Sequence, residues 1–190
     1  MLHIVYGGSA SGKSSYAESF AMSLQGEGRL LYIATMYPYK WNTTEIDPET
    51  MQRIERHRAM RADKGFDTVE CYRHVEHIVA KRQDVLLLEC MSNLLANEMY
   101  LEPDSNAGSD MAETMSPVSN KIVQALIDLS TRVQELVIVT NDVFSDGGSL
   151  TYDESTREYV KNLAEINCAL AREAATVTEI VCGIPVEIKR

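Results

Sequence analysis

The sequence predicts an α/β fold like that of P-loop NTPases, with a mostly parallel central sheet and helices on both faces. Short apolar segments alternate along the chain with longer segments of helical periodicity, an order typical of parallel sheets. The first apolar segment leads into Gly7-Gly8-Ser9-Ala10-Ser11-Gly12-Lys13-Ser14, which has the spacing of a phosphate-binding loop. The segment 84–90 (DVLLLEC) is apolar almost throughout, as expected of a parallel strand covered on both faces.

The length and composition indicate a soluble globular protein. A chain of 190 residues is expected to form a single nucleotide-binding domain over residues 1–190. Its 45% hydrophobic and 24% charged residues are ordinary for this class. The net charge of -10 repels a phosphate polymer, so we expect no nucleic-acid partner.

No targeting or membrane segment is visible in the sequence. The N-terminus enters an apolar strand pattern directly, and no apolar run approaches the ~20 residues of a membrane span. We therefore expect a cytoplasmic protein. The four cysteines include no Cys-x-x-Cys pair, and Cys90 and Cys182 end apolar runs, so both are expected to be small core residues.

The first half of the chain predicts two strands and three helices. A strand at 2–6 leads through the glycines into a helix at 13–24, and a second strand follows at 29–35. Asp47-Pro48 is a helix start, with the aspartate as N-cap and the proline at the first helical position, and this helix runs to about residue 61. A shorter helix is expected at 74–82.

The second half begins with the apolar strand at 84–90 and a helix at 91–100. The segment 101–117 (LEPDSNAGSDMAETMSP) is acidic and rich in turn formers, which predicts a mobile surface loop. A helix at 118–132 and a strand at 135–140 follow.

A long helix is expected within 152–175, because Tyr159, Leu163, Ile166 and Leu170 form one apolar stripe. Strands at 177–182 and 185–188 end the sequence.

The glycine-rich loop after the first strand predicts a nucleoside triphosphate site. Its backbone N–H groups, from Gly7 to Ser14, would surround phosphate oxygens at a helix N-terminus. Lys13 would reach the β- and γ-phosphates, and the Ser14 hydroxyl would hold Mg²⁺. A GTPase switch is disfavoured, because the only comparable base-reading segment, Thr140-Asn141-Asp142, lacks the lysine.

Glu89 lies at the end of the predicted strand 84–90. Carboxyl ends of parallel strands border the nucleotide crevice, and P-loop enzymes place an acid there beside the magnesium ion. Glu89 is therefore a candidate metal-side acid, although a strand-end carboxylate can also face water.

A basic segment at 53–61 (RIERHRAMR) stands out in so acidic a chain. Arg53, His57 and Arg61 are four residues apart and form one stripe on a helix. Such arginines could grip phosphate oxygens while the histidine attacks phosphorus and forms a phosphoramidate. The spacing alone favours a solvated amphipathic helix, in which Glu49 and Arg53 form an ordinary i,i+4 pair.

Taken together, these segments resemble the bifunctional adenosylcobinamide kinase / adenosylcobinamide-phosphate guanylyltransferase family of cobalamin biosynthesis. The likeness runs nearly from end to end. It rests on these segments in order: GGSASGKSSYAE, LYIAT at 31–35, RIERHRAMR at 53–61, TVEC at 68–71, LLLEC at 86–90, VIVTND at 137–142, and the closing residues 163–189 with Gly-Ile-Pro-Val.

The resemblance implies two reactions. ATP or GTP phosphorylates the aminopropanol hydroxyl of adenosylcobinamide, and GMP then passes from GTP through a guanylylated histidine to the phosphorylated corrinoid, with release of pyrophosphate. The family's histidine falls on His57, and the family also implies a homotrimer. Family positions in contact with nucleotide fall on the loop 7–14 and on Ala34, Thr35, Met36, Arg58, Arg61, Glu70 and Glu89.

Three departures from the family pattern concern the relative rates of the two reactions and the nucleotide preference. The first is Ala10, which replaces the arginine usual in the phosphate loop. The second is Ala62 and Phe66, which replace a proline and a tryptophan with one residue inserted, and the third is the acidic loop 101–117, which matches no family segment. Two alternative functions remain at this stage. One is a small-molecule kinase without guanylyl transfer, and the other is a non-catalytic nucleotide-binding regulator.

Overall fold

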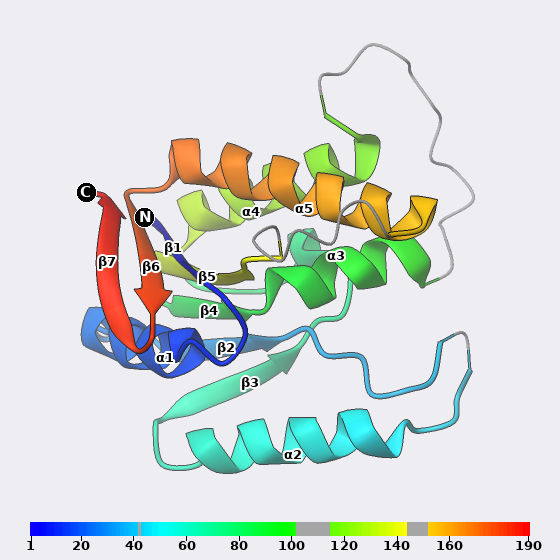
Figure 1. Ribbon diagram of the computed structural model, residues 1–190. Coiled ribbons are helices and arrows are strands. Elements are labelled where there is room, and N and C mark those ends of the chain that lie inside the picture. The colour runs from blue at the N-terminus through cyan, green and yellow to red at the C-terminus, as the bar shows by residue number, and fades with distance from the viewer. Residues whose placement is uncertain (42, 102–114, 144–151) are drawn as a thin grey trace.

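A seven-stranded sheet forms the centre of the computed structural model, which describes residues 1–41, 43–101, 115–143 and 152–190 (Figure 1). The strand order is β3-β2-β4-β5-β1-β6-β7. All neighbouring strands are parallel except β6 and β7. The strands are β1 (Leu2–Gly7), β2 (Leu30–Ala34), β3 (Phe66–Glu70), β4 (Val85–Glu89), β5 (Glu135–Asn141), β6 (Thr176–Val181) and β7 (Ile184–Lys189).

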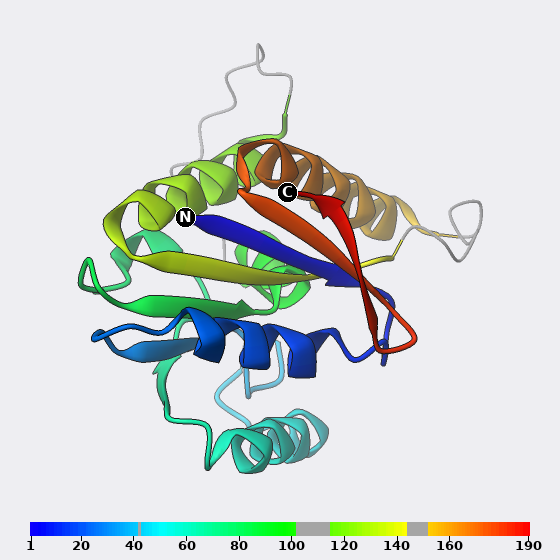
Figure 2. The same ribbon diagram turned by 90° about the vertical axis from the view of Figure 1, so that its left-hand side faces the viewer.

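Helices cover both faces of this sheet, which confirms the predicted fold class (Figure 2). One face carries α1 (Lys13–Leu24), and the other carries α3 (Met91–Tyr100), α4 (Pro117–Arg132) and α5 (Glu154–Glu173). The central strands are buried on both sides: Leu86 and Leu88 pack toward α3 and α4, whereas Val85 and Leu87 pack toward α1. No helix in the described part of the chain is long and apolar enough to cross a membrane.

The remaining long helix, α2 (Pro48–Arg61), lies apart from these layers, beyond β3 (Figures 1 and 2). It begins as the sequence predicts: the Asp47 side chain accepts a hydrogen bond from the Thr50 N–H, and Pro48 stands at the first helical position. Ser116 and Asp153 cap α4 and α5 in the same way. Along α2, which is described in full, Arg61 is the one buried residue.

The structure differs from the sequence predictions at three places. The edge strand β3 was not predicted, because its sequence FDTVE is polar and mostly exposed. The helix expected at 74–82 is wrong: only a single 3₁₀ turn, Val75–His77, forms there. Cys182 is exposed in the β6–β7 turn at a φ of 51°, and is not a core residue.

Two predictions about organisation remain untested. Most of the loop expected at 101–117 lies outside the described residues, of which Leu101 and 115–117 are the exceptions. The single domain over 1–190 also stays a prediction. All four cysteines are free.

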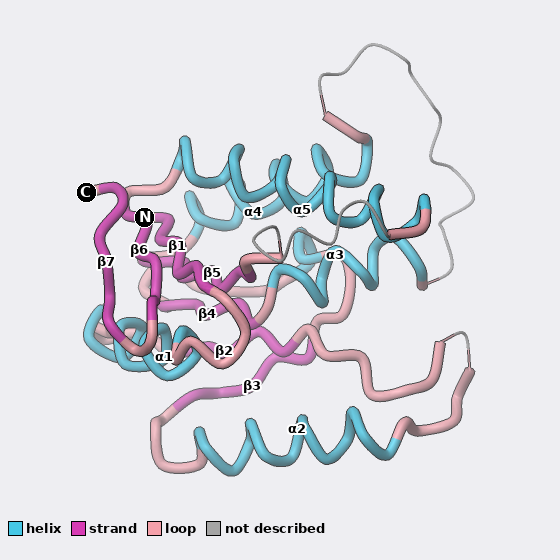
Figure 3. The backbone as a smooth tube through the Cα atoms, in the orientation of Figure 1, coloured by secondary structure: helices cyan, strands magenta, loops and turns pink. Residues whose placement is uncertain are grey.

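The carboxyl ends of β1, β2, β4 and β5 lie at one edge of the sheet and continue into loops (Figure 3). Strand register brings Gly7 opposite Asn141 and Ala34 opposite Glu89. In open α/β sheets this edge is where ligands bind. The fold therefore gathers the ends of four strands beside the glycine-rich loop.

At the opposite edge, the Asp84 carboxylate joins the starts of β2 and β4. It is 1% exposed and accepts hydrogen bonds from the Arg29 backbone N–H (3.0 Å), the Arg29 guanidinium (2.5 Å) and the Lys81 N–H (2.8 Å). Burial alone would raise the pKa of Asp84, but these hydrogen bonds outweigh it and hold the pKa below its ordinary value.

We predict that Asp84→Asn destabilises the protein by about 1–3 kcal/mol at pH 7, because a buried charged hydrogen bond is lost. The pKa of Asp84 is lowered on folding, so its stabilisation is full above its unfolded pKa and is lost as the pH falls toward the folded pKa. Urea unfolding of the wild type and the variant between pH 7 and pH 3 measures this. A stability difference that stays constant down to pH 3 would contradict the assignment.

Candidate active site

The glycine-rich loop connects β1 to the N-terminus of α1. Gly12 adopts a φ of 93°, a left-handed conformation that favours glycine. A Cβ at Gly7 would lie 2.8 Å from both the Ile180 carbonyl oxygen and the Ser11 Oγ, so a larger residue does not fit there. The turn between β6 and β7 contacts the loop: the Gly183 N–H donates a hydrogen bond to the Ser11 carbonyl oxygen (2.8 Å).

Lys13, the first residue of α1, is buried within this loop. It is 8% exposed, and its Nζ donates to the Gly8 carbonyl oxygen at 2.9 Å. Burial lowers the pKa of Lys13, while the neighbouring Cys90 and Glu89 oppose that shift. The lysine is therefore held at the mouth of the loop, where a phosphate group would meet it.

The Glu89 carboxylate is the centre of the site. Its Oε1 accepts a hydrogen bond from the Ser14 hydroxyl (2.6 Å), and its Oε2 accepts one from the Tyr32 hydroxyl (2.6 Å). The His57 Nδ1 lies 3.9 Å from the same Oε1. Burial, followed by the charge of Glu89, raises the pKa of Tyr32, so this phenol stays a donor. One carboxylate thus joins the phosphate loop, β2 and α2.

The basic stripe of α2 faces the same space. Arg53, His57 and Arg61 all line the cavity beside the loop. The Arg61 guanidinium carbon lies 3.4 Å from the centre of the Tyr32 ring, a cation–π contact. Among the described residues the buried Arg61 Nη1 has no hydrogen-bond partner, so it is a donor available to an anion.

Arg58, on the neighbouring face of α2, is tied to β3. Its Nη2 lies 2.5 Å from the Glu70 Oε1, and the Tyr72 hydroxyl donates to the Glu70 Oε2 at 2.9 Å. Burial, together with Glu70, raises the pKa of Tyr72. Tyr72 in turn contacts the ring of Tyr37, which holds the loop leaving β2.

Polar groups at the ends of β2, β4 and β5 complete the cavity. The Oγ1 of the buried Thr35 lies 3.0 Å from both the Glu89 and the Cys90 carbonyl oxygens, which share its one proton. The Asn141 amide donates to the Ser92 Oγ at 2.6 Å. Burial raises the pKa of the Cys90 thiol, which therefore stays protonated and is a poor nucleophile.

The cavity has a volume of about 500 Å³. Most residues that the sequence singles out line it: Ser9, Lys13, Ser14, Ala34, Thr35, Met36, Arg53, His57, Arg58, Arg61, Glu70 and Glu89. The other predicted loop residues, Gly7, Gly8, Ala10, Ser11 and Gly12, shape the loop without lining the cavity.

Sequence reasoning did not select Tyr32, Tyr72 and Ser92, which also belong to the site. Tyr32 carries a usable signal, because a tyrosine inside the buried strand LLYIA needs a partner for its hydroxyl. Tyr72 and Ser92 carry no such signal, since they follow a strand or begin a helix in ordinary polar sequence.

Comparison with known proteins places the chain in a family. The family model described as "Cobinamide kinase / cobinamide phosphate guanyltransferase" matches residues 3–188. The chain is 30% identical over 198 residues to the "Bifunctional adenosylcobalamin biosynthesis protein CobU" of Escherichia coli K12, covering 100% of both chains. It is likewise 30% identical over 197 residues to the protein of that name from Salmonella typhimurium LT2, again over 100% of both.

Among solved structures, the chain is similar to the flagellar accessory protein FlaH from Methanocaldococcus jannaschii. That likeness has a TM-score of 0.48 and 12% identity, and covers 99% of this chain and 77% of the other. The sequence matches identify the family, because they extend over nearly the whole chain and include both the phosphate loop and the basic helix. The chain belongs to the cobinamide kinase / cobinamide-phosphate guanylyltransferase family of adenosylcobalamin biosynthesis.

Proposed function

We propose that this enzyme carries out both family reactions in the cavity beside the phosphate loop, with His57 as the residue that carries GMP. The observation that carries the proposal is the shared carboxylate: Glu89 accepts a hydrogen bond from Ser14 of the phosphate loop and lies 3.9 Å from His57. A triphosphate held by the loop therefore lies within reach of the imidazole.

In the guanylyl transfer, a nitrogen of neutral His57 attacks the α-phosphorus of GTP. A P–N bond forms as the bond from the α-phosphorus to the bridging oxygen breaks, and pyrophosphate leaves. A phosphate oxygen of adenosylcobinamide phosphate then attacks the same phosphorus and displaces the imidazole. The product is adenosylcobinamide-GDP, and His57 is regenerated.

Cationic side chains are arranged to stabilise the charge that develops on the phosphates. Lys13 is buried beside the loop, and Arg61 has a buried Nη1 without a hydrogen-bond partner in the described structure. Arg53 and Arg58 line the same cavity. Fixed donors in a site with little water stabilise a transition state more strongly than donors in solution.

The donor set also fits Mg²⁺, which prefers oxygen ligands. The Ser14 Oγ and the Glu89 Oε1 lie 2.6 Å apart, so both oxygens face one position beside the phosphate loop. We include Ser14 and Glu89 as the residues that would hold the ion. Bound Mg²⁺ would neutralise phosphate charge during both transfers.

The kinase step uses ATP or GTP and the hydroxyl of adenosylcobinamide, as the family function implies. The cytoplasmic location stays part of this proposal. So does the homotrimer, which an exposed apolar face supports. On β7, Ile184, Val186 and Ile188 point to one side and are 65%, 41% and 61% exposed.

We predict that α-labelled GTP labels the wild type with an acid-labile, alkali-stable bond, the behaviour of a phosphoramidate. His57→Ala should abolish the label because no other residue supplies the P–N bond. Arg56→Ala is the matched control, since Arg56 is exposed on the same helix and does not line the cavity. Label that persists in His57→Ala would overturn the assignment, and phosphorylation of adenosylcobinamide without any label would favour the kinase alone.

We predict that Glu89→Gln raises the Mg²⁺ concentration needed for half-maximal kinase activity about 10–100-fold, because a charged oxygen ligand is lost. Magnesium titrations of initial rate measure this. Glu55→Gln removes an exposed carboxylate of α2 that does not line the cavity and serves as control. An unchanged magnesium dependence in Glu89→Gln would remove Glu89 from the metal site.

We predict that light scattering after gel filtration gives three times the chain mass of 21.3 kDa. The double variant Ile184→Glu/Ile188→Glu should lower that mass, because charges would be buried in the subunit contact. Met22→Glu changes an exposed apolar residue of α1 and should leave the mass unchanged. A monomer at micromolar concentration would contradict the trimer.

A further inference from the structure

A second cavity, of about 1250 Å³, lies beside the first in the described part of the chain. The two share Glu70 and Tyr72, which line both. The rest of its lining comes from the loop after β2, which contributes Tyr37, Thr43 and Thr44, from the segment 71–79, and from Val69 and Leu101. A molecule bound there would border directly on the nucleotide site.

The sizes of the two cavities match two substrates of unequal size. A cavity of about 500 Å³ is in the range of a nucleotide-sized ligand. It cannot also contain a corrinoid ring, which is several times larger than a nucleobase. This step rests on the proposed function, which requires a nucleotide and a corrinoid to meet.

The lining of the second cavity combines apolar and hydrogen-bonding groups. Val69, Ile78 and Val79 supply apolar surface, and Val79 is 87% exposed, which is unusual for valine. Thr44 and His77 supply polar groups. Arg73 also lines the cavity, but its Nε lies 3.8 Å from the Glu98 carboxylate, and Glu70 adds a negative charge to the lining. A broad apolar ring bearing neutral carboxamides fits such a surface better than a second polyphosphate, which the carboxylates would repel.

Glu70 and Tyr72, which line both cavities, form a shared wall between the second cavity and the reacting groups. Tyr72 donates to Glu70, Glu70 pairs with Arg58, and Arg58 adjoins His57 on α2. A phosphorylated side arm that crosses this wall would meet the Arg58 guanidinium. The phosphate and the Glu70 carboxylate would then compete for that guanidinium. The path delivers the arm's phosphate to the histidine that carries GMP.

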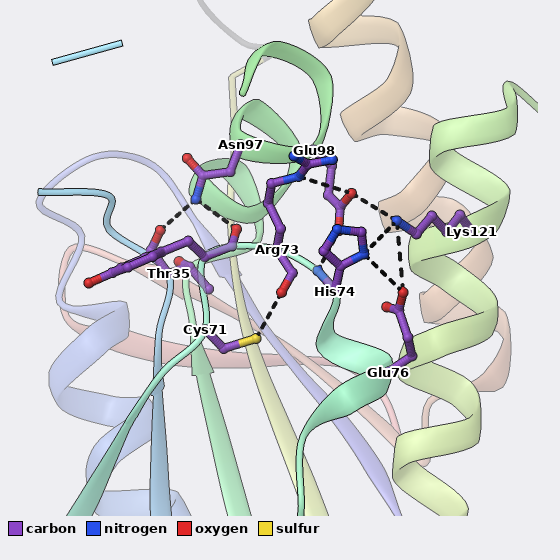
Figure 4. Close-up of polar contacts among 9 residues, drawn as sticks. Thr35, Cys71, Arg73, His74, Glu76, Asn97, Glu98 and Lys121 are labelled. Atoms are coloured by element: carbon purple, nitrogen blue, oxygen red, sulfur yellow. Dashed lines mark hydrogen bonds and ion pairs between the residues drawn. The ribbon is translucent and has the colours of Figure 1, made fainter. Parts of the chain in front are cut away.

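Contacts with α3 and α4 fix the wall in place (Figure 4). The Asn97 amide donates to the Thr35 and Tyr72 carbonyls, so one side chain couples both cavities. The His74 N–H donates to Glu98, which also pairs with Lys121 at 3.1 Å. His74, Glu76 and Glu98 lie close enough together to hold a metal ion, but the Lys121 ammonium already supplies positive charge among them.

We propose that the second cavity binds the corrinoid ring of adenosylcobinamide and of its phosphate, with the side arm passing Tyr72 and Glu70 toward His57. Val79 and His77 then determine corrinoid affinity without contacting the nucleotide.

The test separates the two substrates. Val79→Glu, which adds bulk and charge at an exposed position, should raise the KM for adenosylcobinamide phosphate at least tenfold, and His77→Ala should raise it severalfold. The rate of labelling by α-labelled GTP alone should stay within twofold of wild type. Titration calorimetry with adenosylcobinamide, in the absence of nucleotide, should show the same loss of affinity. Met22→Glu, an equivalent change on α1 away from both cavities, is the matched control.

An unchanged corrinoid KM in both Val79→Glu and His77→Ala would overturn the inference while leaving the labelling reaction intact. Loss of GTP labelling in Val79→Glu would also overturn it, since the cavity would then serve the nucleotide. If the wild type is not labelled by GTP, the proposed function fails instead, and the calorimetric titration still decides whether the cavity binds the corrinoid.

Discussion

The arrangement of the active site depends on the Glu89 carboxylate, which requires hydrogen-bond and charge partners. The Glu89 side chain is only 9% exposed at the end of β4, and an unpaired charge in such a position is costly. Its partners come from α1, β2 and α2, three segments that are far apart in the sequence. The contacts that stabilise the Glu89 carboxylate therefore bring the phosphate loop and the basic helix together. The strand register that puts Glu89 beside Ala34 makes this possible.

Polar contacts rather than a hydrophobic face hold α2 to the rest of the molecule. Arg61 stacks on Tyr32, Arg58 pairs with Glu70, and His57 approaches Glu89. All three contacts involve cavity residues. The side chains that position α2 are thus the same ones that would bind substrate. A change in their charge would therefore also change the position of His57.

Local patterns allowed much of the fold and the phosphate loop to be predicted from the sequence, because each signal lies within a few neighbouring residues. The apolar run of β4, the Asp47-Pro48 cap and the loop spacing are of this kind. The edge strand β3 was missed because its exposed side chains lack an apolar pattern. The helix expected at 74–82 was wrong because the Lys81 N–H binds the Asp84 carboxylate and the chain turns there into β4. The buried position of Tyr32 indicates that its hydroxyl needs a partner, but the partner, Glu89, is 57 residues away and is supplied by the tertiary fold.

The contact between the C-terminal turn and the phosphate loop has a consequence for synthesis of the protein. Gly183 donates to Ser11, and the Ile180 carbonyl fills the space beside Gly7. The loop is synthesised well before these neighbours, because most of the sequence lies between Ser11 and Ile180. At ~5–20 residues per second, the interval is on the order of ten to thirty seconds. During that time the phosphate loop lacks the backbone groups of β6 and of the following turn that pack against it in the folded protein.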